Sequence, residues 1–299
     1  MATCDVSLRP ILRGAFVPTR FTGILRSHHS RVINIELSDQ DGSYFLSLIT
    51  DPMDRTELAV LLGIDQFRTI ESTPAGATVR CIFDSPHDVS AVPPVPKRSP
   101  RELAKALLPA ITALTPTDRS TGLIQLIAPV DTGATAPGTR AGALIGDSGN
   151  AVSETAVGPG RPDPREDPFL LRARKILDAL LTGSAPYDLS PLVGLGIGFT
   201  PSGDDFVSGV LLVQQITGLA LVKTTPIRTA LGKTTTGGAT LLRLALAGAP
   251  PEYLRRIIDF LLQGDREKAV YTARSHGHSS GFDALAGILW AISTAGTII

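Results

Sequence analysis

The N-terminal part of the chain, up to residue 91, carries the pattern of β-strands. Four runs are rich in β-branched and aromatic residues, and turn-forming segments such as 39–42 and 74–76 separate them. The predicted strands cover residues 20–27, 31–37, 43–49 and 78–84. We expect a helix over residues 53–62, between the third and fourth strands.

From residue 168 onward the apolar positions recur at helical spacing. The predicted helices cover residues 169–181, 203–221, 239–248, 252–262, 265–275 and 282–292. Two further helical segments, 101–114 and 121–128, precede them. These patterns predict an α+β fold, in which a β-rich N-terminal part is followed by a mainly α-helical C-terminal part.

Two low-periodicity stretches mark the organisation of the chain. Residues 92–100 hold four prolines, which fix φ and lack a backbone donor, so they predict a boundary. Residues 131–168 turn to Gly, Ala, Pro, Ser and Thr, the composition of a flexible insert. We therefore expect four divisions: a β-rich domain over 1–91, a proline-rich boundary with helices over 92–130, the insert over 131–168, and a helical domain over 169–299.

The helical part contains an internal echo. Residues 200–211 align with residues 278–289 through the pattern S-G-x-D-x-x-x-G-[VI]-L. A pseudo-symmetric pair of helix starts would explain this repetition. Gly209 and Gly287 occupy the same place in the two copies, and they would let two helices cross closely.

A purely structural interpretation covers part of this pattern. Ser202 and Asp205, like Ser280 and Asp283, have the spacing of a capping box, in which a serine accepts a helix amide and an acid reaches back to the cap. Acidic side chains in the first turn of a helix also interact favourably with the helix dipole. This interpretation leaves the second acid, Asp204, without a role.

The glycine-rich lead-in to the first copy favours a ligand site. Gly194, Gly196 and Gly198 would expose backbone amides and allow a ligand to approach, as at helix N-termini that bind anions. Asp204 and Asp205 would repel a bare anion, so they need Mg²⁺, a basic side chain or a substrate NH₂ group beside them. The basic side chains that could balance them are Lys233, Arg243 and Arg274.

Composition narrows the class of partner. The chain has 299 residues, of which 43% are hydrophobic, so it can bury a substantial core. Its 28 basic and 28 acidic residues cancel, which argues against nucleic-acid binding, because that needs a basic surplus. No apolar run has the length and purity of a signal peptide or membrane span, so we expect a cytoplasmic protein that does not bind a membrane.

Several familiar motifs do not fit. The three glycines at 194–198 lack the spacing of the dinucleotide fingerprint, and the Gly-Lys-Thr at 232–234 lacks the first Walker glycine. Thr235 and Thr236 offer either hydroxyls for a ligand or a cap for the helix that follows. His276 and His278 lack the spacing of helical metal ligands, so no zinc site is predicted. The sequence assigns no metal site and no cofactor, although Mg²⁺ remains an option.

The motifs "GLGIGFTPSGDD" at 194–205 and "GHSSGFDALAGIL" at 277–289 resemble those of the AllH-type subunits of oxamate carbamoyltransferase, a bacterial family formerly catalogued as a domain of unknown function. The resemblance covers the C-terminal half, and Ile197 and Phe199 depart from the usual core. It implies an enzyme of purine (allantoin) catabolism that moves a carbamoyl group between oxalurate and phosphate. It also implies companion protein subunits.

Motif chemistry gives the candidate residues their roles. Asp204 or Asp205 would orient the carbamoyl amide or a metal, and His276 or His278 would transfer a proton or stabilise negative charge. The candidate substrate-binding residues are Gly194, Gly196, Gly198, Thr200, Ser202, Gly203, Thr235, Thr236, Arg243, Ser280, Gly281 and Asp283. Two alternatives remain open: a non-catalytic scaffold or regulatory subunit, and a metal-dependent hydrolase of amide or ureido compounds.

Overall fold

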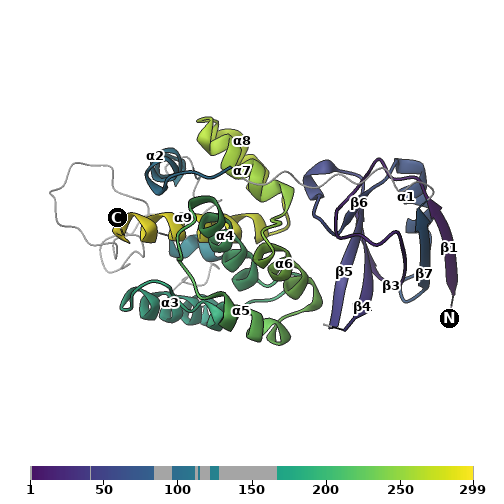
Figure 1. Cartoon of the computed structure of the whole chain (residues 1–299), viewed down its shortest axis with the longest axis horizontal. Coiled ribbons are helices and arrows are strands. Elements are labelled where there is room, and N and C mark those ends of the chain that lie inside the picture. Colours follow the sequence, from purple (N-terminus) through teal and green to yellow (C-terminus); the bar gives the residue numbers. More distant parts are fainter. Residues whose placement is uncertain are drawn as a thin grey trace, which may run out of the picture. The chain divides into compact units, whose positions relative to one another are not determined.

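The structure is a computed structural model, and it describes residues 2–40, 42–83, 96–111, 114, 122–127 and 167–298. The chain divides into two compact units (Figure 1). One comprises Met1–Val95 with Ala239–Arg255 and holds the β-sheet; the other comprises Pro96–Gly238 with Arg256–Ile299 and is helical. The α+β class expected from the sequence is confirmed. The proline-rich segment and the insert lie largely outside the described residues, and the domain limits stay a prediction.

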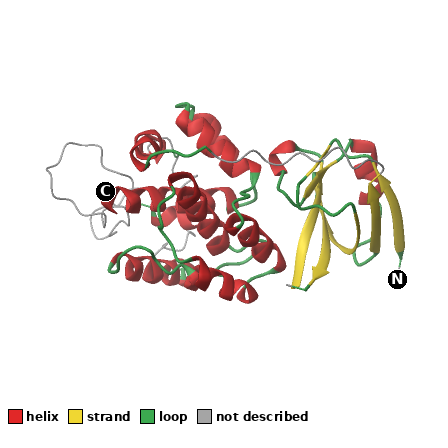
Figure 2. Cartoon of the chain, in the orientation of Figure 1, coloured by secondary structure: helices red, strands yellow, loops and turns green. Residues whose placement is uncertain are grey.

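The first unit contains a single curled sheet of seven strands (Figure 2). The strands are β1 (Thr3–Leu8), β2 (Leu12–Arg13), β3 (Arg20–His28), β4 (Val32–Asp39), β5 (Gly42–Ile49), β6 (Ala59–Leu61) and β7 (Thr78–Phe83). Their order across the sheet is β1-β7-β3-β4-β5-β6-β2. The β1–β7 and β5–β6 pairs are parallel and the others antiparallel.

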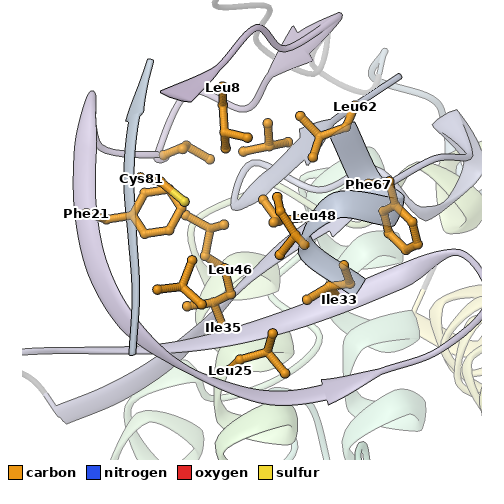
Figure 3. Packing of buried hydrophobic residues seen from close by; sticks show 14 of the residues in the cluster. Leu8, Phe21, Leu25, Ile33, Ile35, Leu46, Leu48, Leu62, Phe67 and Cys81 are labelled. Carbon is orange, nitrogen blue, oxygen red and sulfur yellow. The ribbon is translucent and has the colours of Figure 1, made fainter. Parts of the chain in front are cut away.

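Alternation along the strands builds the core of this unit. In β3, Phe21 and Leu25 are buried while their neighbours Arg20 and Thr22 are exposed, as expected for a sheet with one covered face. Figure 3 shows these side chains meeting Ile35 and others of the same cluster between the strands. Helix α1 (Ile64–Glu71) contributes Phe67 to that cluster.

The hydrophobic pattern located four strands of the sheet correctly but misplaced the helix. The four predicted strands match β3, β4, β5 and β7 to within a few residues at each end. The helix expected over 53–62 is wrong: a 3₁₀ turn η1 (Pro52–Asp54) and the strand β6 occupy that range. The helix begins only at Ile64, after Gly63, because the apolar run before it pairs with β5 and β2.

Hydrogen bonds connect the second stretch of the sheet-containing unit, 239–255, to the first stretch. The backbone amide of Phe45 donates to Thr240 Oγ1 over 3.0 Å, and the amide of Glu252 donates to the Arg55 carbonyl over 2.9 Å. Arg243 Nη1 donates to the Ser43 carbonyl over 3.3 Å. These contacts explain why a helical segment groups with the strands.

The helices of the described chain follow the expected order. They are α2 (Pro100–Ile111), η3 (Gly122–Leu126), α3 (Pro168–Leu181), η5 (Ser190–Leu192), α4 (Ser202–Thr217), α5 (Thr224–Ala230), η6 (Leu231–Lys233), α6 (Thr236–Leu246), α7 (Glu252–Leu262), α8 (Arg266–Arg274) and α9 (Ser280–Ile298). Among the described residues, no helix combines the length and apolar character needed to cross a membrane.

Candidate functional site

The glycine-rich lead-in to α4 is a surface loop with a backbone that only glycine adopts readily. Gly194, Gly196 and Gly198 have φ angles of 75°, 113° and 110°. A Cβ at Gly194 would also clash with the Lys233 carbonyl. Ile197, between the second and third glycines, is 93% exposed. Within the described part of the chain, the amides of residues 196–198 have no protein acceptor.

Asp204 fastens this loop from inside the protein. Its carboxylate accepts the Gly194 amide over 2.9 Å and the hydroxyl of Thr234, and its side chain is fully buried. Gly238 leaves the room that the carboxylate needs, because a Cβ there would overlap Asp204 Oδ2. Burial raises the pKa of Asp204, and the two hydrogen bonds oppose that rise. Asp204 therefore joins the loop to the segment before α6.

A second set of contacts holds the loop at Phe199. Thr235 Oγ1 donates to the Phe199 carbonyl over 2.6 Å and accepts the Gly238 amide over 3.0 Å. A Cβ at Gly237 would clash with Phe199. Thr235 thus caps α6, the structural one of its two expected roles, while also bracing the loop.

The capping box expected at the start of α4 is not formed. The N-cap of α4 is Pro201, with φ −56° and ψ 143°, and it makes no side-chain hydrogen bond to the helix. Ser202 is already inside the helix, where its hydroxyl cannot serve as the cap. The Gly203 amide instead donates to the Leu195 carbonyl over 2.8 Å, so the glycine loop itself satisfies part of the helix terminus.

The acids of the two echoed motifs reach across to the opposite helix. Asp205 of α4 is hydrogen-bonded to Ser280 of α9, and Asp283 of α9 is hydrogen-bonded to Ser202 of α4. Thr200 joins the first pair, because its hydroxyl lies 3.2 Å from both Asp205 Oδ2 and Ser280 Oγ. The repeated S-G-x-D pattern therefore forms two reciprocal bonds between helices.

Two equivalent glycines bring these helices together. A Cβ at Gly209 would clash with the Ala284 carbonyl of α9, and a Cβ at Gly287 would clash with the Phe206 carbonyl of α4. Because Ala284 and Phe206 are themselves aligned in the echo, the two contacts are equivalent. The close crossing expected from the sequence is confirmed, and the echo corresponds to a pseudo-symmetric helix pair.

The crossing places two acids in a region that excludes water. Asp205 is 1% exposed and Asp283 is 0% exposed. Burial raises the pKa of Asp205 well above its usual value, and the charge of Asp283 raises it further. Burial also raises the pKa of Asp283, to about 6, against hydrogen bonds from the Leu123 amide, Ser202 and Ser279. Both acids therefore keep their protons to a higher pH than exposed aspartates do.

The segment before α9 differs from the glycine loop. The Gly281 amide donates to the His276 carbonyl over 3.0 Å, and a Cβ at Gly281 would clash with the Ala273 carbonyl. His276 is half-buried, and His278 is exposed. Gly122, the first residue of η3, approaches α9 from a distant part of the chain: its φ is 57°, and a Cβ there would clash with the Asp283 carboxylate.

The candidate residues do not all gather at one place. Asp204, Asp205, Thr200, Ser202, Ser280 and Asp283 are linked by the contacts above. Arg243 contacts Ser43 of the sheet-containing unit instead. Thr234 and Leu123, which bond to Asp204 and Asp283, were not among the candidate residues, because they approach from distant segments of the chain. Within the described ranges, no group of three or more His, Cys, Asp and Glu side chains is arranged to hold a metal ion.

The site falls within a segment that matches a known family. Residues 192–292 match the family model of the oxamate carbamoyltransferase subunit AllH. The segment carrying the site is AllH-like. The match begins just before the glycine loop and extends into α9, so it includes both echoed motifs. It confirms the resemblance carried by those motifs. No curated protein and no solved structure matches the chain.

Proposed function

We propose that this chain is a subunit of an oxamate carbamoyltransferase-type enzyme and that its glycine loop binds the anionic end of a substrate. The observation that carries the proposal is the AllH match over residues 192–292, which contains the glycine loop and both echoed motifs. The reaction joins a phosphate oxygen to the carbamoyl carbon of oxalurate and breaks that carbon's bond to the oxamate nitrogen. The nitrogen leaves with a proton as the amide of oxamate.

The geometry of the loop supports an anion there. Gly196 and Gly198 set backbone amides at the surface, next to the N-terminal end of α4, where the helix dipole also favours negative charge. Amides held in place in this way also stabilise the oxygen on which charge develops during acyl transfer. Substrate binding is therefore assigned to the loop amides.

The buried acids serve as positioning residues. Asp204 and Asp205 already accept hydrogen bonds from within the chain, and neither is more than 1% exposed. Asp204 holds the glycine loop in place. Asp205 stabilises the crossing of α4 and α9, next to the end of that loop. Proton transfer stays assigned to His276 or His278, which lie closer to solvent.

A non-catalytic subunit is the second candidate. The observation that favours it is the same internal satisfaction of the acids, because a scaffold needs such contacts without needing a substrate. The companion subunits implied by the name of the matched family fit both candidates. Enzymatic activity that depends on the exposed glycine loop would distinguish the carbamoyltransferase subunit from the non-catalytic one.

Phosphate-dependent loss of oxalurate, measured with and without companion subunits, tests the proposal. We expect turnover in the complete mixture. Ile197→Glu should raise KM for oxalurate by roughly tenfold, because a carboxylate beside the loop repels an anion. Ile197→Gln has nearly the same size without the charge and should stay close to the unaltered protein.

Two results would count against this function. No turnover in the complete mixture would remove the carbamoyltransferase assignment. Turnover with equal KM values for the two Ile197 variants would keep the assignment but remove the loop as the anion site. Ile197 is 93% exposed, so neither variant should change the melting temperature.

A further inference from the structure

A pocket in the helical unit is lined by α2 with the segment before it, and by the end of α7 with the start of α8. Figure 1 labels these three helices. The volume of the pocket is about 460 Å³, within the range of small-molecule sites. None of the residues singled out in the sequence lines it. Three of its lining side chains are cationic, namely Arg98, Lys105 and Arg266, and Ala106 and Leu262 add apolar surface.

The backbone that carries Arg98 is held in place. The Arg98 amide donates to the Ile216 carbonyl of α4 over 3.0 Å, and Lys97 Nζ donates to the Gln215 carbonyl. The α2 helix then starts with a capping box, in which Glu102 accepts the Ser99 amide and hydroxyl, each over 2.9 Å. One wall of the pocket is therefore preorganised.

The opposite wall is equally well fixed. The α7 helix ends at Leu262, Gly264 follows it with a φ of 79°, and the Asp265 amide donates to the Phe260 carbonyl over 2.8 Å. Asp265 then caps α8 by accepting the Lys268 amide over 3.1 Å, and it pairs with Lys268 Nζ. Arg266 is the first residue of α8, so this turn determines its position.

The charges of the pocket do not cancel. Of the described residues that line it, Glu102 is the one carboxylate; the Ser99 hydrogen bonds lower the pKa of Glu102, and Arg98 lowers it further. Glu102 therefore offsets part of the charge of Arg98, and Asp265 is paired with Lys268. Among the described residues, Lys105 and Arg266 form no ion pair. A chain without net charge thus concentrates two uncompensated cations here.

We propose that this pocket binds a small dianion with an apolar part, either a phosphate monoester or a dicarboxylate. Two surplus positive charges match a dianion. The planar guanidinium groups of Arg98 and Arg266 suit the paired oxygens of phosphate or carboxylate. Ala106 and Leu262, which are partly exposed, provide the surface against which an apolar group would pack. This site is independent of the proposed reaction.

Calorimetric titration of the full chain at low salt tests the proposal with three probes: phenyl phosphate, phthalate and benzoate. We expect at least one of the two dianions to bind more tightly than benzoate, which carries a single charge. Tighter binding of phenyl phosphate identifies the ligand as a phosphate ester, and tighter binding of phthalate identifies it as a dicarboxylate. Added salt should weaken the binding, because exposed charges are screened.

Substitutions of lining residues test whether the dianion binds in this pocket. Arg266→Gln and Lys105→Gln should each weaken the tighter dianion by about tenfold, because each removes a charged hydrogen-bond donor. Arg172→Gln removes an exposed cation of α3 that does not line the pocket, and it should leave the affinity unchanged. Melting temperatures of all three variants verify that each remains folded.

Three outcomes would overturn the proposal. They are the absence of binding by both dianions at millimolar concentration, benzoate binding as tightly as the dianions, and equal weakening in the Arg172 variant. Loss of dianion binding in the pocket variants alone would support it. Because the titration does not involve oxalurate turnover, failure of this proposal and failure of the proposed function are separate results.

Discussion

The N-terminal ends of α4 and α9 carry the same sequence motif, but the segments that precede the two helices differ. Both contribute a serine, an acid and a glycine to the crossing. The α4 copy adds a glycine loop that Asp204 fastens from inside. The α9 copy has the buried phenyl ring of Phe282 at the position equivalent to Asp204. The shared features build the helix pair, and the difference indicates which copy carries the exposed site.

The crossing itself should be the most sensitive feature. Gly209→Ala and Gly287→Ala should each cost roughly 2–3 kcal/mol, because the added methyl group meets a backbone carbonyl that cannot easily move. The double variant should lose more stability than either single variant. Urea unfolding measures the loss. Gly232→Ala is the matched control, since a Cβ there meets nothing within 4 Å.

Equal stability of the Gly209, Gly287 and Gly232 variants would contradict the close crossing. A large loss at Gly209 with none at Gly287 would show instead that the two copies are not equivalent. The comparison therefore tests the pseudo-symmetry as well as the contact.

The buried acid pair predicts a pH dependence of stability. The pKa of Asp283 is about 6 in the folded protein and 3.8 as the unperturbed reference, so the folded state holds the proton more tightly. The contribution to stability is therefore greatest below pH 3.8 and falls as the pH rises through about 6. The complete shift corresponds to on the order of 3 kcal/mol. The raised pKa of Asp205 adds a pH dependence of the same sign.

Urea unfolding of the unaltered protein and of Asp283→Asn, between pH 4 and pH 8, measures this effect. The variant should show a shallower fall in stability over that range, because asparagine does not ionise. The difference between the two proteins isolates Asp283 from other titrating groups. Parallel pH profiles would mean that Asp283 is not perturbed.

Asp204 should have a smaller effect that is confined to one copy. Asp204→Asn should cost about 2 kcal/mol, because the amide cannot accept both the Gly194 amide and the Thr234 hydroxyl. Hydrogen exchange should accelerate at the amides of Gly194 and Leu195, which are hydrogen-bonded, and remain unchanged at 276–280. Asp178→Asn, an exposed acid of α3, serves as the control. Equal acceleration in both segments would contradict a local fastening role.

The sequence was a good guide where an element has a long and regular pattern. Most of the strands and helices of ordinary length were predicted, but the six-residue strand β1 was missed. The strands β2 and β6 were also missed, because two or three residues carry no readable alternation. The helix α5 was also missed, since Thr224–Ala230 contains a proline and few apolar residues. These elements depend on the partners with which they pack.

At the site, spacing revealed which residues belong together but not the direction of their side chains. The S-x-x-D spacing predicted a capping box, yet Pro201 takes the cap position and Asp205 turns toward α9. That choice depends on the crossing at Gly209, which is a tertiary contact. Thr234, the partner of Asp204, could not be found from spacing, because it approaches from a distant segment.

The central claim is that each acid bonds across the crossing rather than within its own helix, and a double-mutant cycle tests it most directly. Asp205→Asn combined with Ser280→Ala should give a coupling energy of about 0.5–3 kcal/mol in urea unfolding. Asp205→Asn combined with Ser202→Ala should give a distinctly smaller value. A larger coupling for the Ser202 pair would restore the capping box and contradict the reciprocal helix pair.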